Sequence, residues 1–146
     1  MGFFLFEFLP DKLKNQTDYP KIAKSVIPTE FWSAGDLFHG VADAFWQKKT
    51  QGVFPKTTRE DKGTHPLYVV DSSNYGLRIC PCTSKSPGPP PRWYIPGGVS
   101  LRNTGEKKDR TTYILKNLRG PLRKDETVSP AFYWGMFPPE ELCEEK

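Results

Sequence analysis

The sequence has few of the residues on which several functional classes depend. It contains three cysteines and two histidines among 146 residues. A small, odd number of cysteines fits a reducing compartment better than a disulfide framework. So few histidines give no basis for a serine–histidine–aspartate arrangement, and Gly97-Gly98 is typical of a turn rather than of a phosphate-binding loop. We expect no cofactor.

Long hydrophobic runs are missing as well. No run approaches the roughly 18 apolar residues that a membrane span requires. The aromatic segment at residues 3–9 is short and is interrupted by Glu7, so we expect no signal peptide. The chain is 36% hydrophobic and 26% charged, which is typical of a soluble globular chain. We therefore expect one folded domain that is cytoplasmic and makes no membrane contact.

The cysteine spacing does not favour a metal centre. Cys80 and Cys82 are two positions apart, and in a strand such side chains share one face. Zinc sites usually place two to four residues between their cysteines. Only Cys143 and the two histidines remain as further ligands of that kind. We expect no metal site and predict that Cys80 and Cys82 are small buried residues.

Charge is modest in total but uneven along the chain. The net charge is +4. Residues 102–124 carry eight basic and two acidic side chains, whereas residues 125–146 carry one basic and six acidic ones. A basic stripe of this kind can bind a polyanion. A solvated face is the plainer alternative.

The first 32 residues read as a structural extension. Asp18 is a plausible N-cap, Pro20 is tolerated in a first turn, and Pro28 ends the pattern. The spacing predicts a short amphipathic helix over residues 18–27. Its apolar face consists of Tyr19, Ile22, Ala23, Val26 and Ile27.

From Ser33 onward, short strands and turns dominate the pattern. Alternation predicts a strand over residues 38–46, and Leu67–Val70 is apolar throughout, as in a strand buried on both faces. The proline-rich residues 86–91 form a loop, because proline lacks the ladder donor. The pattern predicts a mainly β chain, a small and strongly bent antiparallel barrel at 33–146. Further strands are expected at 77–84, 93–95 and 111–119, a basic loop at 47–62, a turn at 71–76 and a short C-terminal helix near 138–143.

Several motifs in this order resemble one known family, the MazF/PemK-like toxins. Each motif is weak alone, and the order of the set carries the resemblance, which covers roughly residues 33–146. The motifs are Gly35-Asp36, Gly63-x-His65-Pro66, Asn74 in a turn, Thr83-Ser84, the strand from Tyr113 to Arg119, and Gly135-x-Phe137 followed by Pro139-Glu140-Glu141-Leu142.

The resemblance implies an SH3-like barrel that forms a homodimer and cleaves single-stranded RNA without a metal. Such a protein is the toxin of a toxin–antitoxin pair, and an acidic or disordered antitoxin segment would cover its basic groove. Carried over residue by residue, Thr83 and Ser84 match the family pattern. His65 stands where the family has an arginine that serves the scissile phosphate.

Metal-free RNA cleavage needs a base, a cation that stabilises the phosphorane, and an acid. His65 can transfer protons near neutral pH, and Thr83 and Ser84 can donate hydrogen bonds to phosphate. Arg119 completes the expected catalytic set, because its guanidinium offers a bidentate fork to phosphate. The expected RNA contacts are Arg59, Lys62, Arg78, Lys85 and Trp93.

Each of these residues also has a structural interpretation. His65 can simply cap its strand, and a Thr-Ser pair at a strand end usually bonds turn backbone. Trp93 can stack on an unpaired base or pack into the barrel or a dimer interface. Two function hypotheses therefore stand: an endoribonuclease toxin, and a barrel without catalysis that binds a protein or a nucleic acid through the same groove.

Overall fold

The computed structural model describes residues 28–54, 63–128 and 130–146. The helix predicted at 18–27 and the cations Arg59 and Lys62 lie outside the described residues. Within them the protein is mainly β, and its antiparallel strands curl into a half-barrel with one α-helix. This confirms the mainly β class and the strongly bent antiparallel architecture.

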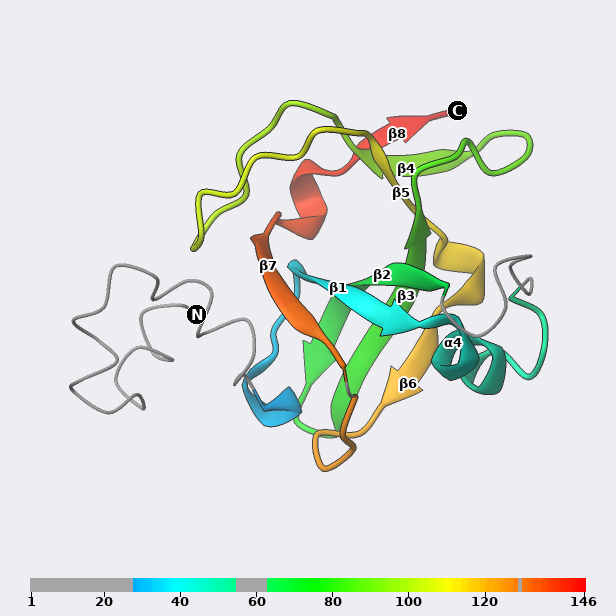
Figure 1. The fold of residues 1–146 in the computed structure, drawn as a ribbon, viewed down its shortest axis with the longest axis vertical. Coiled ribbons are helices and arrows are strands. Elements are labelled where there is room, and N and C mark those ends of the chain that lie inside the picture. The colour runs from blue at the N-terminus through cyan, green and yellow to red at the C-terminus, as the bar shows by residue number, and fades with distance from the viewer. Residues whose placement is uncertain (1–27, 55–62, 129) are drawn as a thin grey trace.

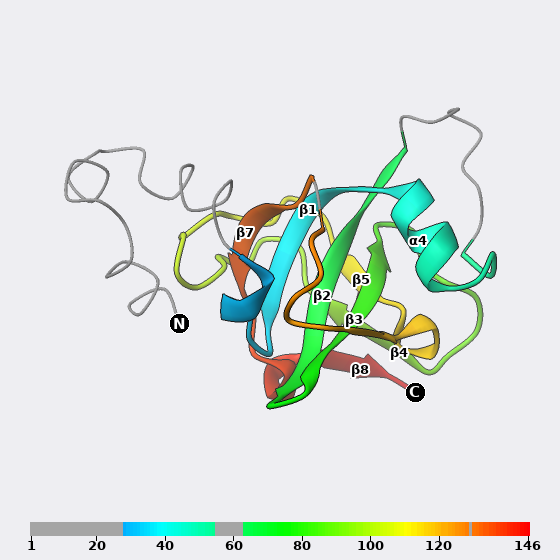
Figure 2. The same ribbon diagram turned by 90° about the horizontal axis from the view of Figure 1, so that it is seen from below.

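The strands form one sheet in the order β7-β1-β2-β3-β5-β4-β8, and β6 pairs with β3 beside this path. Figures 1 and 2 show the strands curling and α4 at the end of β1. Helix α4 spans Asp43–Lys49, and short 3-10 helices span Thr29–Phe31, Lys116–Leu118 and Pro139–Glu141. The strands are β1 Asp36–Ala42, β2 Thr64–Ser73, β3 Gly76–Thr83, β4 Arg92–Ile95, β5 Thr112–Ile114, β6 Gly120–Leu122, β7 Phe132–Met136 and β8 Cys143–Glu145.

The predicted strand over residues 38–46 is wrong in its second half. Strand β1 ends at Ala42, and α4 begins at Asp43, so Lys48 and Lys49 of the predicted basic loop are helical. The helix places an acid in its first turn and two lysines in its last, which complements its dipole. Trp46 is buried from this helix. The apolar or small residues at every second position from 38 to 46 resemble a strand pattern, but Ala44 among them is exposed.

The predicted strand over residues 111–119 is also interrupted. Strand β5 ends at Ile114, the next residues form a 3-10 helix, and β6 begins at Gly120. The strand is interrupted where the chain moves from one end of β3 to the other. The N–H of Leu115 donates to the carbonyl oxygen of Pro81 at 3.0 Å, and β6 then runs beside the opposite end of β3.

The C-terminus differs from its prediction as well. The expected helix is only the 3-10 turn Pro139–Glu141, after which β8 pairs with the free edge of β4. Arg92 Nη1 and Glu145 Oε1 lie 2.6 Å apart across this pair. Strand β7, which precedes this turn, was absent from the predictions.

The core lies on both faces of the sheet. Strand β2 sends Leu67 and Val69 to one apolar cluster and Tyr68 to the other, so the prediction of a strand buried on both faces is confirmed. Cys80 and Cys82 are buried in the second cluster, as predicted. The two clusters fix β2 and β3, the strands whose ends form the candidate site.

The Gly35-Asp36 pair has a structural role at the start of β1. Gly35 has φ +95°, and a Cβ there would lie 2.9 Å from the carbonyl oxygen of Phe137. The N–H of Gly35 donates to the carbonyl oxygen of Val69 at 2.7 Å. Asp36, only 2% exposed, accepts a hydrogen bond from the N–H of Ser33 at 2.9 Å. The motif therefore closes the beginning of β1 against two neighbouring segments.

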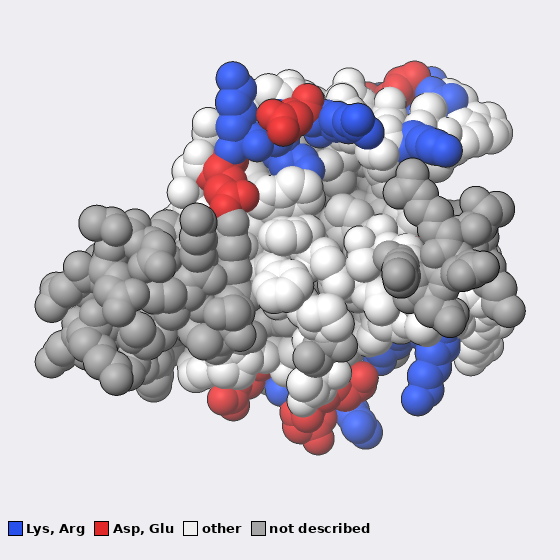
Figure 3. Space-filling view, viewed as in Figure 1, with Lys and Arg blue, Asp and Glu red and all other residues white. Residues whose placement is uncertain are grey.

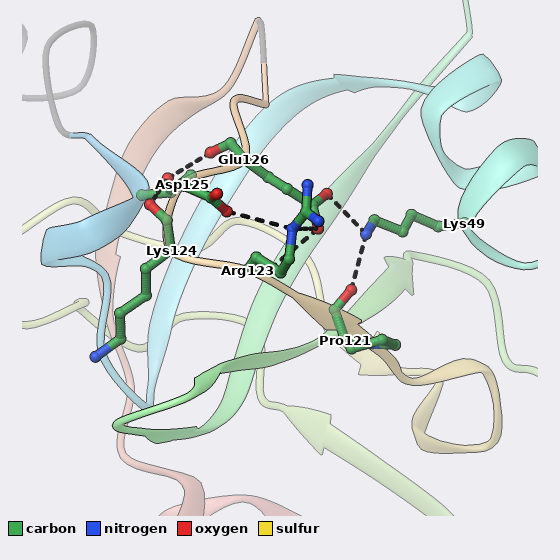
Figure 4. Close-up of polar contacts among 7 residues, drawn as sticks. Lys49, Pro121, Arg123, Lys124, Asp125 and Glu126 are labelled. Carbon is green, nitrogen blue, oxygen red and sulfur yellow. Dashed lines mark hydrogen bonds and ion pairs between the residues drawn. The ribbon is translucent and has the colours of Figure 1, made fainter.

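A polar clasp attaches the end of α4 to β6 and to the segment that follows β6 (Figure 4). Lys49 Nζ donates to Glu126 Oε2 at 2.9 Å and to the carbonyl oxygen of Pro121 at 2.8 Å. Thr29 Oγ1 lies 3.0 Å from the carbonyl oxygen of Lys124 and 2.5 Å from that of Glu126. The clasp holds the helix whose first residue, Asp43, reaches the candidate site.

Asp36 predicts a pH dependence of stability. Burial raises the pKa of its carboxyl from 3.8 to about 7, against the lowering effect of the hydrogen bonds from Ser33 and Tyr133. Between about pH 4 and 7 the folded protein retains a proton that the unfolded chain releases, so the free energy of unfolding falls as the pH rises. We expect Asp36→Asn, which stays neutral, to flatten this decline.

Thermal unfolding of both proteins between about pH 4.5 and 7 measures the effect. Parallel changes in melting temperature for the two proteins would show that Asp36 does not titrate in this range.

Candidate functional site

The ladder between β2 and β3 ends early at one end of the sheet. Leu67 and Pro81 form its last pair among the described residues. Pro66 and Pro81 have no backbone N–H to donate, so this end of the ladder lacks two of its donors. His65 on β2 and Thr83 on β3 each lie two residues beyond that last pair.

Beyond this point each strand pairs with its outer neighbour. Strand β2 continues along β1, where His65 is opposite Val41. Strand β3 continues along β5, where Thr83 is opposite Tyr113. The sheet therefore divides into two, and a gap opens between the ends of β2 and β3.

A pocket of about 340 Å³ occupies this place. It brings together three of the four predicted catalytic residues, His65, Thr83 and Ser84. The segment that connects β4 with β5 supplies another wall, and β7 supplies an aromatic ring. The remaining lining residues are Thr64, Pro66, Lys108, Asp109, Arg110, Thr111, Thr112 and Trp134.

His65 is held by a carboxylate that sequence reasoning missed. His65 Nδ1 lies 2.5 Å from Asp43 Oδ1, and the two side chains are 24% and 11% exposed. Because a carboxylate accepts hydrogen bonds, Nδ1 donates and neutral His65 carries its lone pair on Nε2. The Phe54 ring packs edge-on at 4.9 Å, which fixes the imidazole further. This geometry suits His65 for accepting a proton at Nε2.

Lys108 is the second residue that the sequence did not single out. It is 3% exposed, and its Nζ lies 3.4 Å from the centre of the Trp134 ring. Burial lowers the pKa of Lys108 to about 8, although Cys82 and Asp109 act in the opposite direction. Lys108 therefore places a positive charge in the pocket at neutral pH, and this charge is lost more readily than that of an ordinary lysine.

The Thr83-Ser84 pair combines a turn role with a place in the pocket. Thr83 Oγ1 accepts a hydrogen bond from the N–H of Lys85 at 3.2 Å, which is the expected bond to turn backbone. This bond orients the hydroxyl and uses it only as an acceptor, so its proton is available to an anion. Ser84 is exposed at the strand end.

The other predicted residues in the described part of the chain do not join this pocket. Arg119 is exposed after the 3-10 helix, and Lys85 follows Ser84 without lining the pocket. Arg78 lies 3.9 Å from Asp71 and is five residues from Thr83, roughly 16 Å along an extended strand.

Trp93 packs against the sheet, in line with the structural alternative given for it above. It is half-buried against the second apolar cluster, and Lys116 Nζ lies 4.7 Å from the centre of its ring. It does not line the pocket.

Acidic side chains partly neutralise the basic segment at residues 102–124. Arg102 pairs with Glu141 at 2.6 Å, and Arg123 pairs with Asp125 at 3.2 Å. Figure 3 shows Lys and Arg mixed with Asp and Glu along the upper rim, while the middle of this face, over β1 and β7, is uncharged. The cations that face the pocket are Lys108 and Arg110.

No family model, curated protein or solved structure matches this chain. In residues 28–54, 63–128 and 130–146, no helix is long and apolar enough to cross a bilayer. The same residues contain no group of three or more His, Cys, Asp or Glu side chains placed to hold a metal ion.

The pocket predicts pH-dependent anion binding. Because burial lowers the pKa of Lys108 to about 8, we expect the affinity for sulfate, which does not titrate in this range, to fall as the pH rises from 6.5 to 9.5. A charge-assisted hydrogen bond contributes about 1.5–3 kcal/mol, so the fall should be about tenfold or more. Isothermal titration calorimetry measures it.

Lys108→Arg should lose less of its sulfate affinity over this range than the unaltered protein, and Lys108→Met should bind sulfate weakly throughout. Arg123→Ala is the matched control, because Arg123 is an exposed cation that does not line the pocket. Equal sulfate affinity of the unaltered protein at both pH values would contradict the assignment of Lys108.

Proposed function

We propose that this protein is a metal-independent endoribonuclease that cleaves single-stranded RNA and serves as the toxin of a toxin–antitoxin pair. One observation carries the proposal: His65, oriented by Asp43, shares a pocket with Thr83, Ser84 and the buried cation Lys108. This set offers a proton acceptor, hydroxyl donors and a positive charge to one phosphodiester.

The chemistry follows from the lone pair on His65 Nε2. His65 takes the proton of the ribose 2′-hydroxyl, and the 2′ oxygen attacks the adjacent phosphorus. The charge that develops on the phosphorane is stabilised by Lys108 and by a hydrogen bond from Thr83. The bond from phosphorus to the 5′ oxygen breaks, and the ammonium of Lys108 gives that oxygen its proton. The products are a 2′,3′-cyclic phosphate and a 5′-hydroxyl.

Lys108 takes the part that the family resemblance assigns to an arginine before Pro66. In this chain that position is His65, which contributes proton transfer instead of charge. A lysine with a lowered pKa can both stabilise a phosphorane and release a proton, whereas arginine releases its proton with difficulty. With histidine at position 65, His65 supplies proton transfer and Lys108 supplies the positive charge, so both roles remain filled.

The biological setting in the proposal rests on the residue resemblance to MazF/PemK-like toxins. It consists of an SH3-like barrel as the domain at 33–146, a homodimer, a cytoplasmic location and an antitoxin partner with an acidic or disordered segment. Such a segment would compete with RNA for Lys108 and Arg110, the cations that line the pocket.

Cleavage of a mixed-sequence single-stranded RNA in the presence of EDTA tests the proposal. We expect His65→Ala to lower the cleavage rate about 10²–10⁴-fold, because it removes the general base. Asp43→Asn should lower the rate about 10–100-fold and change its pH profile, because the amide cannot hold the same tautomer. The 3′ ends of the fragments should carry 2′,3′-cyclic phosphates.

Arg123→Ala is again the matched control and should cleave at the original rate. Circular dichroism and melting temperature establish that each variant is folded. Absence of cleavage by the unaltered protein, or equal cleavage by folded His65→Ala, would overturn the mechanism. RNA binding without cleavage would favour the alternative of a non-catalytic binding barrel.

A further inference from the structure

Three aromatic side chains lie together beside the pocket, on β1 and β7. The ring of His39 lies 5.6 Å from that of Phe132 and 5.2 Å from that of Trp134, measured between centres. We call His39, Phe132 and Trp134 the aromatic ledge. Trp134 also lines the pocket and carries Lys108 over its ring, so the ledge and the pocket are continuous.

Strand pairing and one glycine build this ledge. His39 is opposite Phe132 in the β1–β7 ladder, and Trp134 follows two positions later, on the same face of β7. Gly40 has φ +77°, and a Cβ at that position would lie 2.7 Å from Phe132 Cδ2. The ring of Phe132 therefore lies against the backbone of Gly40, and a side chain at position 40 would displace the ring.

The ledge is open to solvent at Phe132, while His39 and Trp134 are partly buried. Phe132 is 39% exposed, and with Val53 and Tyr75 it makes up the exposed large hydrophobic residues of the described chain. The nearest pocket cations, Lys108 and Arg110, lie on the segment before β5. The pocket and the ledge meet at Trp134, because Lys108 lies over its ring, while Phe132 and His39 extend the ledge away from the lining residues.

We propose that the aromatic ledge binds the unpaired bases of the RNA next to the phosphate that the pocket holds. The inference rests on the proposed function and adds to it the place where the strand runs. Aromatic rings bind unpaired bases by stacking, and such contacts tolerate any base sequence. The ledge takes the role that the sequence pattern suggested for Trp93, which is half-buried and lies outside the pocket.

The test uses a 2′-O-methyl hexanucleotide, which has no 2′-hydroxyl nucleophile, and an abasic strand with the same number of phosphates. Phe132→Ala should weaken binding of the hexanucleotide about tenfold or more, in line with one lost stacking contact. Binding of the abasic strand should not change. Tyr75→Ala is the matched control, because Tyr75 is a 95% exposed aromatic residue at the β2–β3 turn, and it should bind both strands normally.

A second variant protects the test from a folding defect. Phe132→Tyr keeps the ring and should bind the hexanucleotide as the unaltered protein does, whereas Phe132→Leu should lose the same affinity as Phe132→Ala. Equal hexanucleotide binding by Phe132→Ala and the unaltered protein would overturn the proposal that the ledge binds bases. The proposal would also be overturned if the unaltered protein were a dimer and Phe132→Ala alone were a monomer, because the ring would then belong to a dimer interface. In the first case, RNA cleavage by the unaltered protein would leave the proposed nuclease function intact.

Discussion

The candidate site depends on the point where β2 and β3 stop pairing. Two prolines at this end, Pro66 and Pro81, cannot donate to the ladder, and past Leu67 each strand pairs only with its outer neighbour. The division occurs between strands that two apolar clusters hold firmly. The sheet thus ends in a gap whose walls carry His65 on one side and Thr83 on the other. Precise placement of reacting groups requires such support.

Two elements from elsewhere in the chain complete this gap. Helix α4 brings Asp43 to His65, and Lys49 at its other end pairs with Glu126. Both ends of the helix are therefore held, which positions the Asp43 carboxylate against His65. The segment before β5 brings Lys108, whose charge is buried over Trp134. Burial has two effects on this lysine: it concentrates the charge where an anion can use it, and it lowers the pKa, so the proton is released more easily.

The sequence permits prediction of what local patterns determine. The β class, the buried strand at Leu67–Val70 and the proximity of His65 to Thr83 follow from periodicity and from two consecutive strands joined by a turn. Asp43 could not be predicted, because its contact with His65 depends on a helix that the alternation of apolar residues disguised as strand. Lys108 could not be separated from its charged neighbours, since only the tertiary fold buries it. Arg78 is predicted from its charge, and Arg119 from its charge and its place at the end of a motif of the resemblance, but neither signal fixes where the curled sheet carries the side chain, and neither residue lines the pocket.

The central claim is that His65, Thr83 and Lys108 act on one phosphate group. Nuclear magnetic resonance of the imidazole rings tests it most directly, because the chain has only two histidines, His39 and His65. Titration with a 2′,3′-cyclic nucleotide, the expected product, should shift the His65 ring signals and the amide signals of Thr83, Ser84 and Lys108 with one common dissociation constant. A His65 ring that remains unshifted while the nucleotide saturates the protein elsewhere would contradict the account.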